Sequence, residues 1–594
     1  TNELTYNVPN PSASGYLDKL VLNARRQLIM EGNHMLFRDA NAVGPGTFAT
    51  YEISNTNNQV VVWDVSDPLN PVNQEFNFSA GLTSFVAGNS ALAEFVIFDG
   101  TNFASPKYKE KVSNQNLHSL GDHDYVIISH PLFLQQANRL ADIHRQVDNM
   151  KVAVVTTPQI YNEYSSGAKD VSAIRDFLRM FYERAINPQD IVKYVCLFGD
   201  GSYDNRSIIT SNTNFIPTYQ SRDSKYPIWS FVSDDFYVLL DPSEGNWIPF
   251  TSEYLDMGIG RLPVKNLKEA NTVIDKIEQY LGLSHKTAGC NNGLSTETIF
   301  GDWRNVIMCV ADDEDSNIHI SDADKLTRKI KDSNPEYNID KVYFDSFQQV
   351  SNAGGQRFPE VTAAIKKRIE KGALFVNYTG HGGELGWAHE GVLTISDING
   401  WDNPVRMPAF MTATCEFSRY DDPGRTSAGE ITFLREGGGA IALLSTVRLV
   451  TSFANAQLNN AMYEQIFERI DGEMPRLGDV MRKTKNAYTA NNTRNFTLLG
   501  DPALRLAYPE NKVITTHINN KPAATFADTL KAFEKVTVKG EVQDINNQKL
   551  TSFNGFLYPS IFDKAATVTT LSNDPGSPPF SFKVQSNVLY RGKA

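Results

Sequence analysis

Short apolar segments alternate with segments of helical spacing between residues 124 and 506, and this alternation constrains the fold more than any other feature of the sequence. The first three apolar segments are residues 125–129, 152–155 and 194–198, and residues 132–147 between them have helical spacing. A strand that is apolar along its whole length is buried on both faces, as in a parallel sheet with helices on each side. The pattern therefore predicts an α/β architecture for this part of the chain.

A second run of the same kind begins at Val306. Its predicted strands are residues 306–311, 341–344, 373–378, 409–414 and 440–446. Its predicted helices are residues 323–331, 360–371 and 427–436. Because a single core rarely holds so many residues, we expect two α/β subdomains, at residues 121–298 and 299–508.

The residues on either side of this region have a different composition. Residues 1–120 contain short β-branched and aromatic runs between Asn, Pro and Gly clusters, which predicts a β-rich domain of the sandwich or jelly-roll type. Residues 509–594 show a similar pattern and predict a small Ig-like β-sandwich. No obvious closing strand precedes Ala594, so we expect this last domain to be incomplete or followed by more chain.

The overall charge excludes several classes of function. The 594 residues include 56 Lys and Arg against 68 Asp and Glu, a formal net charge of −12. Phosphates would be repelled, which argues against a nucleic-acid partner. No apolar run reaches 18 residues, so no transmembrane helix is expected. The four cysteines form no Cys-x-x-Cys pair, which argues against a disulfide scaffold and against a zinc site of that type.

Two reactive side chains follow two strands of the second subdomain. One strand leads into a Gly-rich turn that contains His381, and the other ends at Cys415. If these strands are neighbours, an imidazole and a thiol emerge side by side, which is the arrangement of covalent acyl transfer. The backbone N–H groups of Gly382 and Cys415 are then the expected oxyanion donors. A buried core thiol beside a loop histidine is the alternative, but two strand-end positions in consecutive units favour the dyad.

Several motifs resemble the gingipain family of cysteine peptidases. They are Gly-His-Gly-Gly at 380–383 with the following Trp387, Thr-Ala-Thr-Cys at 412–415, Gly-Ile-Gly-Arg-Leu-Pro at 258–263, Ala-Asp-Asp-Glu-Asp at 311–315 and Leu-Gly-Asp-Pro-Ala-Leu at 499–504. The resemblance covers residues 122–508. It implies a caspase-like catalytic α/β/α subdomain paired with a second α/β subdomain, and a catalytic dyad of His381 and Cys415.

The same resemblance implies a third catalytic residue. In that family an acidic residue just before the Ile-Gly-Arg motif orients the imidazole, and the matching position here is Asp256. We therefore expect the Asp256 carboxylate to accept a hydrogen bond from His381, with a solvated loop aspartate as the alternative. The flanking β domains, through short motifs at 561–564 and 579–582, resemble the sortases of type IX secretion more than the gingipains proper.

An acidic loop at residues 312–315 follows the first strand of the second subdomain. One interpretation is a calcium site at Asp313 and Asp315, because calcium prefers hard oxygen ligands. A second is an acidic substrate pocket for a basic side chain, formed by Asp312 and Asp313 with Trp387 as a wall of the cleft. A third is a solvated loop that caps the next helix.

No cofactor is required for the predicted chemistry, and calcium is the only metal that the sequence suggests. His389 lies eight residues after His381 (389 − 381), which is not the spacing of the HExxH zinc motif. Zinc is therefore disfavoured, and the remaining histidines are expected to be structural.

Three functions are consistent with these features. The first is a sortase-type peptidase of type IX secretion that removes C-terminal signal domains from cargo through a thioester at Cys415 and transfers the cargo to a lipopolysaccharide-type amine or to water. For this function the resemblance implies an outer-membrane β-barrel partner and a peripheral place on the surface of a Gram-negative cell. The second is a gingipain-like endopeptidase that cleaves after basic residues. The third is a catalytically silent surface binding module.

Overall fold

The computed structural model describes residues 20–22, 24–101, 103–222, 226–247, 252–283, 299–531, 533–574, 576–585 and 587–594, so that Cys290 lies outside the described residues. The chain divides into two compact units, residues 1–114 and 115–594. Each unit is described by itself.

The first unit is built from two antiparallel sheets around one core. One sheet has the order β1 (His34–Arg38), β7 (Glu94–Phe98), β3 (Val61–Asp64) and β4 (Val72–Asn73), and the other has the order β2 (Phe48–Ser54), β6 (Leu82–Gly88) and β5 (Asn77–Ser79). The rings of Tyr51, Phe85 and Phe95 meet in the core at centroid distances of 5.1–5.2 Å. The prediction of a β-rich region at this end of the chain is confirmed.

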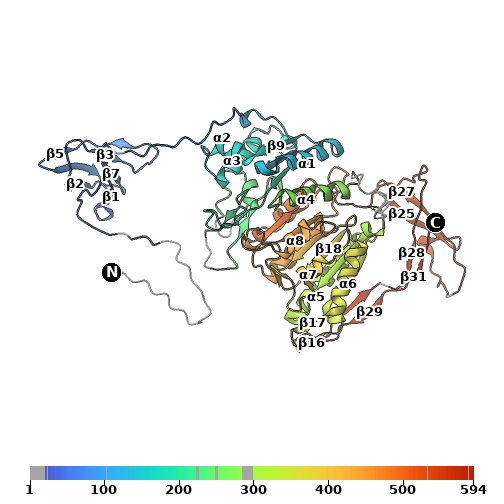
Figure 1. Cartoon of the computed structure of the whole chain (residues 1–594). Helices are drawn as coiled ribbons and strands as arrows, with labels where there is room; N and C mark the ends of the chain where they lie inside the picture. The colour runs from blue at the N-terminus through green and yellow to red at the C-terminus, as the bar shows by residue number, and fades with distance from the viewer. Residues whose placement is uncertain are drawn as a thin grey trace. The chain divides into compact units, whose positions relative to one another are not determined.

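A ten-stranded sheet forms the centre of the second unit (Figure 1). Its order is β15 (Asn338–Tyr343), β14 (Val306–Ala311), β18 (Phe375–Thr379), β22 (Ala409–Ala413), β23 (Ala442–Thr446), β24 (Phe496–Leu499), β13 (Gly258–Leu262), β10 (Tyr194–Phe198), β8 (Tyr125–Ser129) and β9 (Val152–Thr156). The first five strands are parallel to one another, as are the last five, and the two sets meet at the antiparallel pair β23 and β24. The two predicted α/β runs thus share one mixed sheet.

The central strands of this sheet are buried on both faces, which explains why their residues are largely apolar. Tyr125 and Ile127 of β8 belong to the apolar core that includes helices α1 (Leu134–Val147) and α4 (Leu267–Tyr280). Val126 and Ile128 point to the opposite face, toward the core of α2 (Thr157–Tyr164) and α3 (Val171–Arg184). Alternate residues of a strand face opposite sides, so an apolar core on each side requires an unbroken apolar run.

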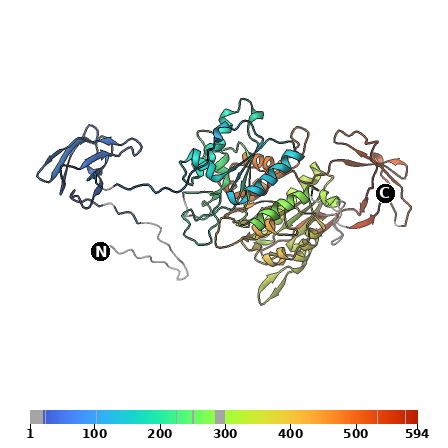
Figure 2. The ribbon, with the colours of Figure 1, turned by 45° about the horizontal axis from the view of Figure 1, so that its top comes forward.

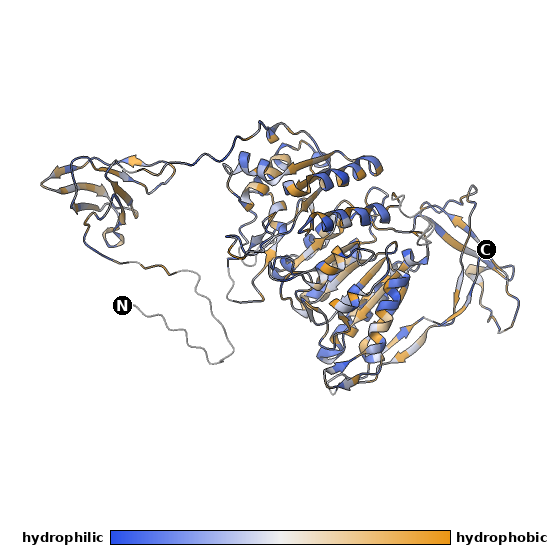
Figure 3. Cartoon of the chain, viewed as in Figure 1, coloured by the Kyte–Doolittle hydropathy of each residue, from blue (hydrophilic) through white to orange (hydrophobic). Residues whose placement is uncertain are grey.

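The remaining helices are α5 (Glu314–Ser333), α6 (Pro359–Lys371), α7 (Ile395–Asn399), α8 (Ala428–Leu434), α9 (Ser452–Gln465) and α10 (Leu477–Ala487). Helix α10 packs on β13 and on α9. Figures 1 and 2 show α1 and α4 side by side, and α4 also contacts α8 of the other half. Figure 3 shows largely hydrophobic strands between helices of mixed hydropathy, as expected for a covered sheet.

The C-terminal part of the second unit contains short strands in three small sheets. One sheet contains β25 (Lys512–Ile518), β26 (Lys521–Pro522) and β27 (Val538–Gln543), a second pairs β28 (Ser560–Phe562) with β31 (Val588–Arg591), and a third pairs β29 (Ala566–Thr569) with β30 (Ser581–Val584). Phe582 packs on Tyr343 of β15 with ring centroids 4.7 Å apart, which fastens the third sheet to the α/β half. The prediction of strands here is confirmed, and the Ig-like sandwich stays a prediction.

Among the described residues, no helix is both long enough and apolar enough to cross a membrane.

Candidate active site

The predicted strand pair that carries His381 and Cys415 is present. Strands β18 and β22 are parallel neighbours, with Thr379 in register with Ala413. The N–H of Gly380 donates to the carbonyl of Ala413 at 3.4 Å, so the two chains leave the sheet together. Each reactive residue lies two positions beyond its registered strand end, which places the imidazole and the thiol on neighbouring turns at one edge of the sheet.

The backbone around His381 is fixed by a buried carboxylate. The N–H of His381 donates to Asp312 Oδ2 at 2.8 Å, and Tyr378 Oη donates to the His381 carbonyl at 2.6 Å. A Cβ at Gly380 would lie 2.3 Å from the Cβ of Asp312, and the φ of Gly380 is +157°. Only glycine fits this close approach, which explains the Gly-His pair at the end of the strand.

The His381 imidazole lies among polar side chains of α5. Its Nε2 lies 3.0 Å from Asp315 Oδ2, and Nε2 of His319 lies 3.4 Å from the same oxygen. His389 stacks on the other side, with ring centroids 5.4 Å apart. His381 Nδ1 has no hydrogen-bond partner in the part of the chain that the structure describes. The ring is thus held at one nitrogen and can exchange a proton at the other. Burial lowers the pKa of His319, which favours its neutral imidazole.

The Cys415 thiol is half-buried and bonded to backbone. Sγ donates to the Val450 carbonyl and accepts from the Val450 N–H, both at 3.5 Å, and it forms no hydrogen bond with His381. Burial raises the pKa of the Cys415 thiol, the Val450 N–H opposes this, and the charge of Glu416 adds to it. The resting residue is therefore a thiol, which needs a base to become a nucleophile. Cys196 and Cys309 are buried in the sheet.

The predicted hydrogen bond between Asp256 and His381 does not form. The Asp256 carboxylate accepts instead from the Leu240 N–H at 3.0 Å, and its own N–H donates to the Val238 carbonyl. Burial is the main cause that raises the pKa of Asp256 to about 6. The carboxylate at His381 is that of Asp315, because α5 follows β14, the strand next to β18, whereas Asp256 is tied to the segment around residue 239.

The predicted substrate pocket at Trp387, Asp312 and Asp313 is also corrected. All three side chains have no exposed surface, so none can contact a substrate. Trp387 stacks on Tyr378 with ring centroids 4.3 Å apart and an interplanar angle of 5°. Asp312 is occupied by its hydrogen bonds to the turn at His381. Asp312 therefore holds the turn at His381, and none of the three predicted residues lines a cleft.

The two aspartates predicted to bind calcium have different surroundings. Asp315 lies with the histidines, whereas both carboxylate oxygens of Asp313 are buried without a hydrogen-bond partner. Burial, followed by the charges of Asp312 and Glu390, raises the pKa of Asp313 to about 8. The calcium site stays a prediction. The oxyanion roles of Gly382 and Cys415 do too, although a Cβ at Gly382 would lie 2.7 Å from Thr414 Oγ1, so the turn requires glycine there.

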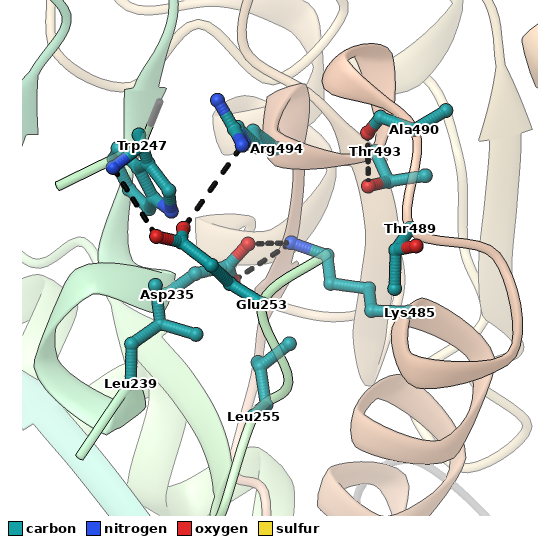
Figure 4. Close-up of a pocket in the computed structure, with 10 residues that line it drawn as sticks. All are labelled: Asp235, Leu239, Trp247, Glu253, Leu255, Lys485, Thr489, Ala490, Thr493 and Arg494. Carbon is teal, nitrogen blue, oxygen red and sulfur yellow. Dashed lines mark hydrogen bonds and ion pairs between the residues drawn. The ribbon is translucent and has the colours of Figure 1, made fainter. Parts of the chain in front are cut away.

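A separate pocket lies beside α10 (Figure 4). Its lining residues are Asp235, Leu239, Trp247, Glu253, Leu255, Lys485, Thr489, Ala490, Thr493 and Arg494. Lys485 Nζ lies 2.6 and 2.7 Å from the Asp235 carboxylate oxygens, and an Arg494 nitrogen lies 4.0 Å from a Glu253 oxygen. The acidic groups of this pocket are therefore neutralised by the cations of the same pocket.

Sequence reasoning did not assign Asp315 to His381, and it treated His319 as structural. Both residues lie at the start of α5, four positions apart, directly after the strand that neighbours β18. Because residues 315–317 are left-handed and not helical, the pairing of Asp315 with the imidazoles does not follow from helical spacing, and the sequence holds no signal for it.

The sequence model of the protein family described as Peptidase family C25 matches residues 118–507 of this chain. The structure of dimeric latent PorU from Porphyromonas gingivalis matches with a TM-score of 0.52 and 24% identity, over 95% of this chain and 48% of that chain. The chain thus spans about half of the PorU chain that it matches. The complex of Porphyromonas gingivalis RgpB pro- and mature domains has a TM-score of 0.49 and 15% identity, over 78% of this chain and 99% of that chain. A search of curated proteins gives no match.

Proposed function

The chain belongs to peptidase family C25, the gingipain family of cysteine peptidases, and we propose that it is a sortase-type peptidase of type IX secretion, which removes C-terminal signal domains from secreted cargo. The observation that carries the proposal is the parallel register of β18 and β22, which brings His381 and Cys415 to one edge of the sheet. The likeness in fold to PorU, which extends over both β-rich ends, supports the choice of sortase.

In the proposed reaction, His381 accepts the proton of the Cys415 thiol as the sulfur attacks the carbonyl carbon before the signal domain. The tetrahedral oxyanion is stabilised by the N–H groups of Gly382 and Cys415. The C–N bond then breaks, and the imidazolium gives its proton to the departing amine, which leaves cargo as a thioester on Cys415. A lipopolysaccharide-type amine or water attacks this thioester, loses its proton to His381, and regenerates the thiol. Asp315 holds the imidazolium in place and stabilises its charge.

The acidic residues predicted for the second candidate, a gingipain-like endopeptidase with preference for basic residues, do not form a substrate pocket. Such an enzyme needs an accessible carboxylate for the basic side chain. Asp312 and Asp313 are fully buried. The acidic groups of the separate pocket beside α10 are paired with Lys485 and Arg494, so that pocket is a poor match for a free arginine or lysine.

The reaction is tested by replacing the thiol. We expect Cys415→Ala to abolish release of mature cargo from a fusion that carries the C-terminal signal, and to abolish labelling by a thiol-reactive peptide probe. Cys309→Ala is the matched control, because this thiol lies buried in β14 of the same half of the sheet. Mature cargo from the Cys415→Ala variant would contradict the proposal, as would efficient cleavage of short peptides after Arg or Lys by the unmodified chain. A catalytically silent binding module would release no cargo, whether the chain is unmodified or carries Cys415→Ala.

The partners in this proposal are cargo proteins, an outer-membrane β-barrel that holds the peptidase at the surface of a Gram-negative cell, and a lipopolysaccharide-type acceptor. The half of the sheet from β14 to β23 would be the caspase-like catalytic subdomain, and the C-terminal strands would belong to an Ig-like domain. These proposals rest on the family and on the likeness in fold to PorU.

Calcium is proposed only as a structural ion at Asp313. Two buried carboxylate oxygens without a hydrogen bond suit a hard cation, whereas Asp315 is committed to histidine. Ser577 Oγ donates to the Asp313 carbonyl at 2.7 Å, so an ion here would fix the loop to the C-terminal strands. We expect calcium to raise the melting temperature of the chain and the Asp313→Asn variant to lose this response. An equal response in both proteins would contradict the site.

A further inference from the structure

Three side chains beside Cys415 converge in a way that the proposed reaction does not need. Ligand atoms of Asp315, His319 and His381 all lie within 4.8 Å of one another. Asp315 Oδ2 is 3.0 Å from His381 Nε2 and 3.4 Å from His319 Nε2. Orientation of a catalytic imidazole needs one carboxylate, so the second imidazole is unexplained.

Of the two imidazoles, the proposed reaction explains that of His381 but not that of His319. Only 4% of the surface of His319 is exposed, and its Nε2 has only a 3.4 Å contact with Asp315 Oδ2, which is not aligned as a hydrogen bond. A buried polar atom without a partner costs free energy and is rare in native proteins. The lone polar atom points toward the oxygen that His381 also approaches, and the two rings meet edge to face with centroids 5.4 Å apart. The missing partner of this nitrogen would therefore lie between the three side chains.

The backbone that presents Asp315 is strained. Asp315, Ser316 and Asn317 have φ values of 55°, 62° and 62°, three consecutive left-handed residues without glycine. Each such residue has a conformational cost, and the strain persists only where surrounding contacts impose it. Asn317 Nδ2 donates to the Pro578 carbonyl at 2.7 Å, which holds the turn from outside. The turn thus departs from regular helix geometry where it places the Asp315 carboxylate beside the two imidazoles.

The two separations at the Asp315 carboxylate oxygen fit a transition-metal ion. In a tetrahedral zinc site with bonds of about 2.0–2.1 Å, neighbouring ligand atoms are about 3.4 Å apart. The two separations at Asp315 Oδ2 are close to this edge length. Two imidazoles and one carboxylate are a ligand set for zinc and related ions, whereas calcium and magnesium prefer oxygen alone.

We propose that Asp315, His319 and His381 form a binding site for zinc or a similar divalent transition-metal ion, and that this ion reversibly inhibits the peptidase. The inhibition rests on the proposed function of His381, whereas the binding site does not. A neutral imidazole has one nitrogen lone pair and one N–H. When Nε2 gives its lone pair to the metal, the proton remains on Nδ1, and no nitrogen is left to accept the proton of Cys415. Loss of the ion restores the base.

Binding is tested on the Cys415→Ser variant, so that the reactive thiol cannot hold the metal. We expect calorimetry to find one zinc ion per chain at this site, and cobalt(II) to give the absorption bands of a nitrogen- and oxygen-ligated ion. Adding His319→Gln or Asp315→Asn should weaken zinc binding by at least about tenfold. His389→Gln is the matched control, because His389 stacks on His381 but contributes no ligand atom to the cluster. A zinc affinity that is unchanged by His319→Gln would overturn the site.

Inhibition is tested separately with the thiol present. Zinc should inhibit cargo release by the unmodified chain, a chelator should reverse the effect, and His319→Gln should raise the half-inhibiting zinc concentration by the same factor as its dissociation constant. Each variant is compared with its own activity without zinc. Inhibition that is unchanged in His319→Gln would mean that zinc acts at the sulfur and would overturn the regulatory role. If the chain released no cargo at all, the proposed function would fail, while the calorimetry would still decide the metal site.

Discussion

Two histidines of the second unit bond to carboxylates, but they do so in different ways. His144 in α1 uses both ring nitrogens, with Nδ1 2.6 Å from Asp148 and Nε2 2.7 Å from Asp501, and its side chain is 1% exposed. His381 uses Nε2 alone, 3.0 Å from Asp315, and its side chain is 39% exposed. Both ring nitrogens of His144 therefore have partners, and we call this network closed. Nδ1 of His381 has no partner among the residues that the structure describes, and we call that network open.

The charges of the closed network show what it does. Burial alone would lower the pKa of His144, but the charge of Asp501 and the hydrogen bonds to Asp148 and Asp501 outweigh it and raise this pKa to about 9. Burial likewise opposes the ionised form of Asp148, but hydrogen bonds from His144 and Arg476 lower its pKa to about 2. His144 is therefore a cation at neutral pH, and it ties α1 to the loop after β24. A histidine satisfied at both nitrogens is structural, and one with an open nitrogen is available for proton transfer.

The largest effect expected from this contrast is on activity. His381→Ala should lower kcat/KM for release of the C-terminal signal by about 10⁴-fold or more, because the proposed base for Cys415 is removed. Its free energy of unfolding in urea should change by no more than about 0.5 kcal/mol, since the side chain is partly exposed. Should His144→Ala lose activity to the same extent while it remains folded, the contrast between the two histidines would be wrong.

The next effect is on stability. His144→Ala should lower the free energy of unfolding by about 3–5 kcal/mol, because it leaves the buried Asp501 carboxylate without its cation. His118→Ala is the control, since His118 also lies 2.7 Å from a carboxylate, that of Glu163, but 51% of its side chain is exposed. The exposed pair should contribute at most about 1 kcal/mol. Equal losses in the two variants would show that burial does not separate them.

A somewhat smaller effect is expected from pH. The pKa of His144 is about 9 in the folded chain against 6.5 for an ordinary histidine, so the folded state binds the proton more tightly. This stabilisation is complete below pH 6.5 and is lost as the pH rises through about 9, up to about 3 kcal/mol for a difference of about 2.5 units. On the acid side, the contribution of Asp148 is complete above pH 3.8 and is lost as the pH falls through about 2.

The melting temperature of the unmodified chain should therefore exceed that of His144→Ala by a margin that shrinks between pH 6.5 and pH 9.5. A margin that is constant over this range would contradict the raised pKa of His144.

The elements that were predictable from the sequence are those whose apolar pattern matches their burial. Residues 132–147 and 360–371 had helical spacing and correspond closely to α1 and α6. Helix α9 was missed because it buries polar residues: Asn459 bonds to Asn377 and Thr379 of β18 inside the core. A helix whose buried face carries asparagines has no apolar stripe, so periodicity cannot reveal it.

The same limit applies to the site. The strands that end before His381 and Cys415 could be recognised from short apolar runs. The rule that reactive groups meet at the carboxyl ends of neighbouring parallel strands then predicted that the two residues lie together. The partner of His381 depends on the left-handed turn at residues 315–317, which no pattern of residue types at that position announces. Trp387 of β20 is buried by its stacking on Tyr378 of β18, a contact between two strands that the sequence does not show, and it was therefore predicted to be a wall of the cleft.

The smallest of these effects decides which carboxylate orients the base. Asp315→Asn keeps the size of the side chain but removes the charge that stabilises imidazolium, so kcat should fall by about tenfold with little change in KM, because a hydrogen bond to a charged group is worth about 1.5–3 kcal/mol. Asp256→Asn is the matched control and should leave kcat nearly unchanged, because Asp256 bonds to Leu240 instead of His381. A loss of kcat of about tenfold in Asp256→Asn but not in Asp315→Asn would restore the assignment made from the sequence. All assays are run with a chelator, so that loss of the proposed metal site cannot imitate the effect.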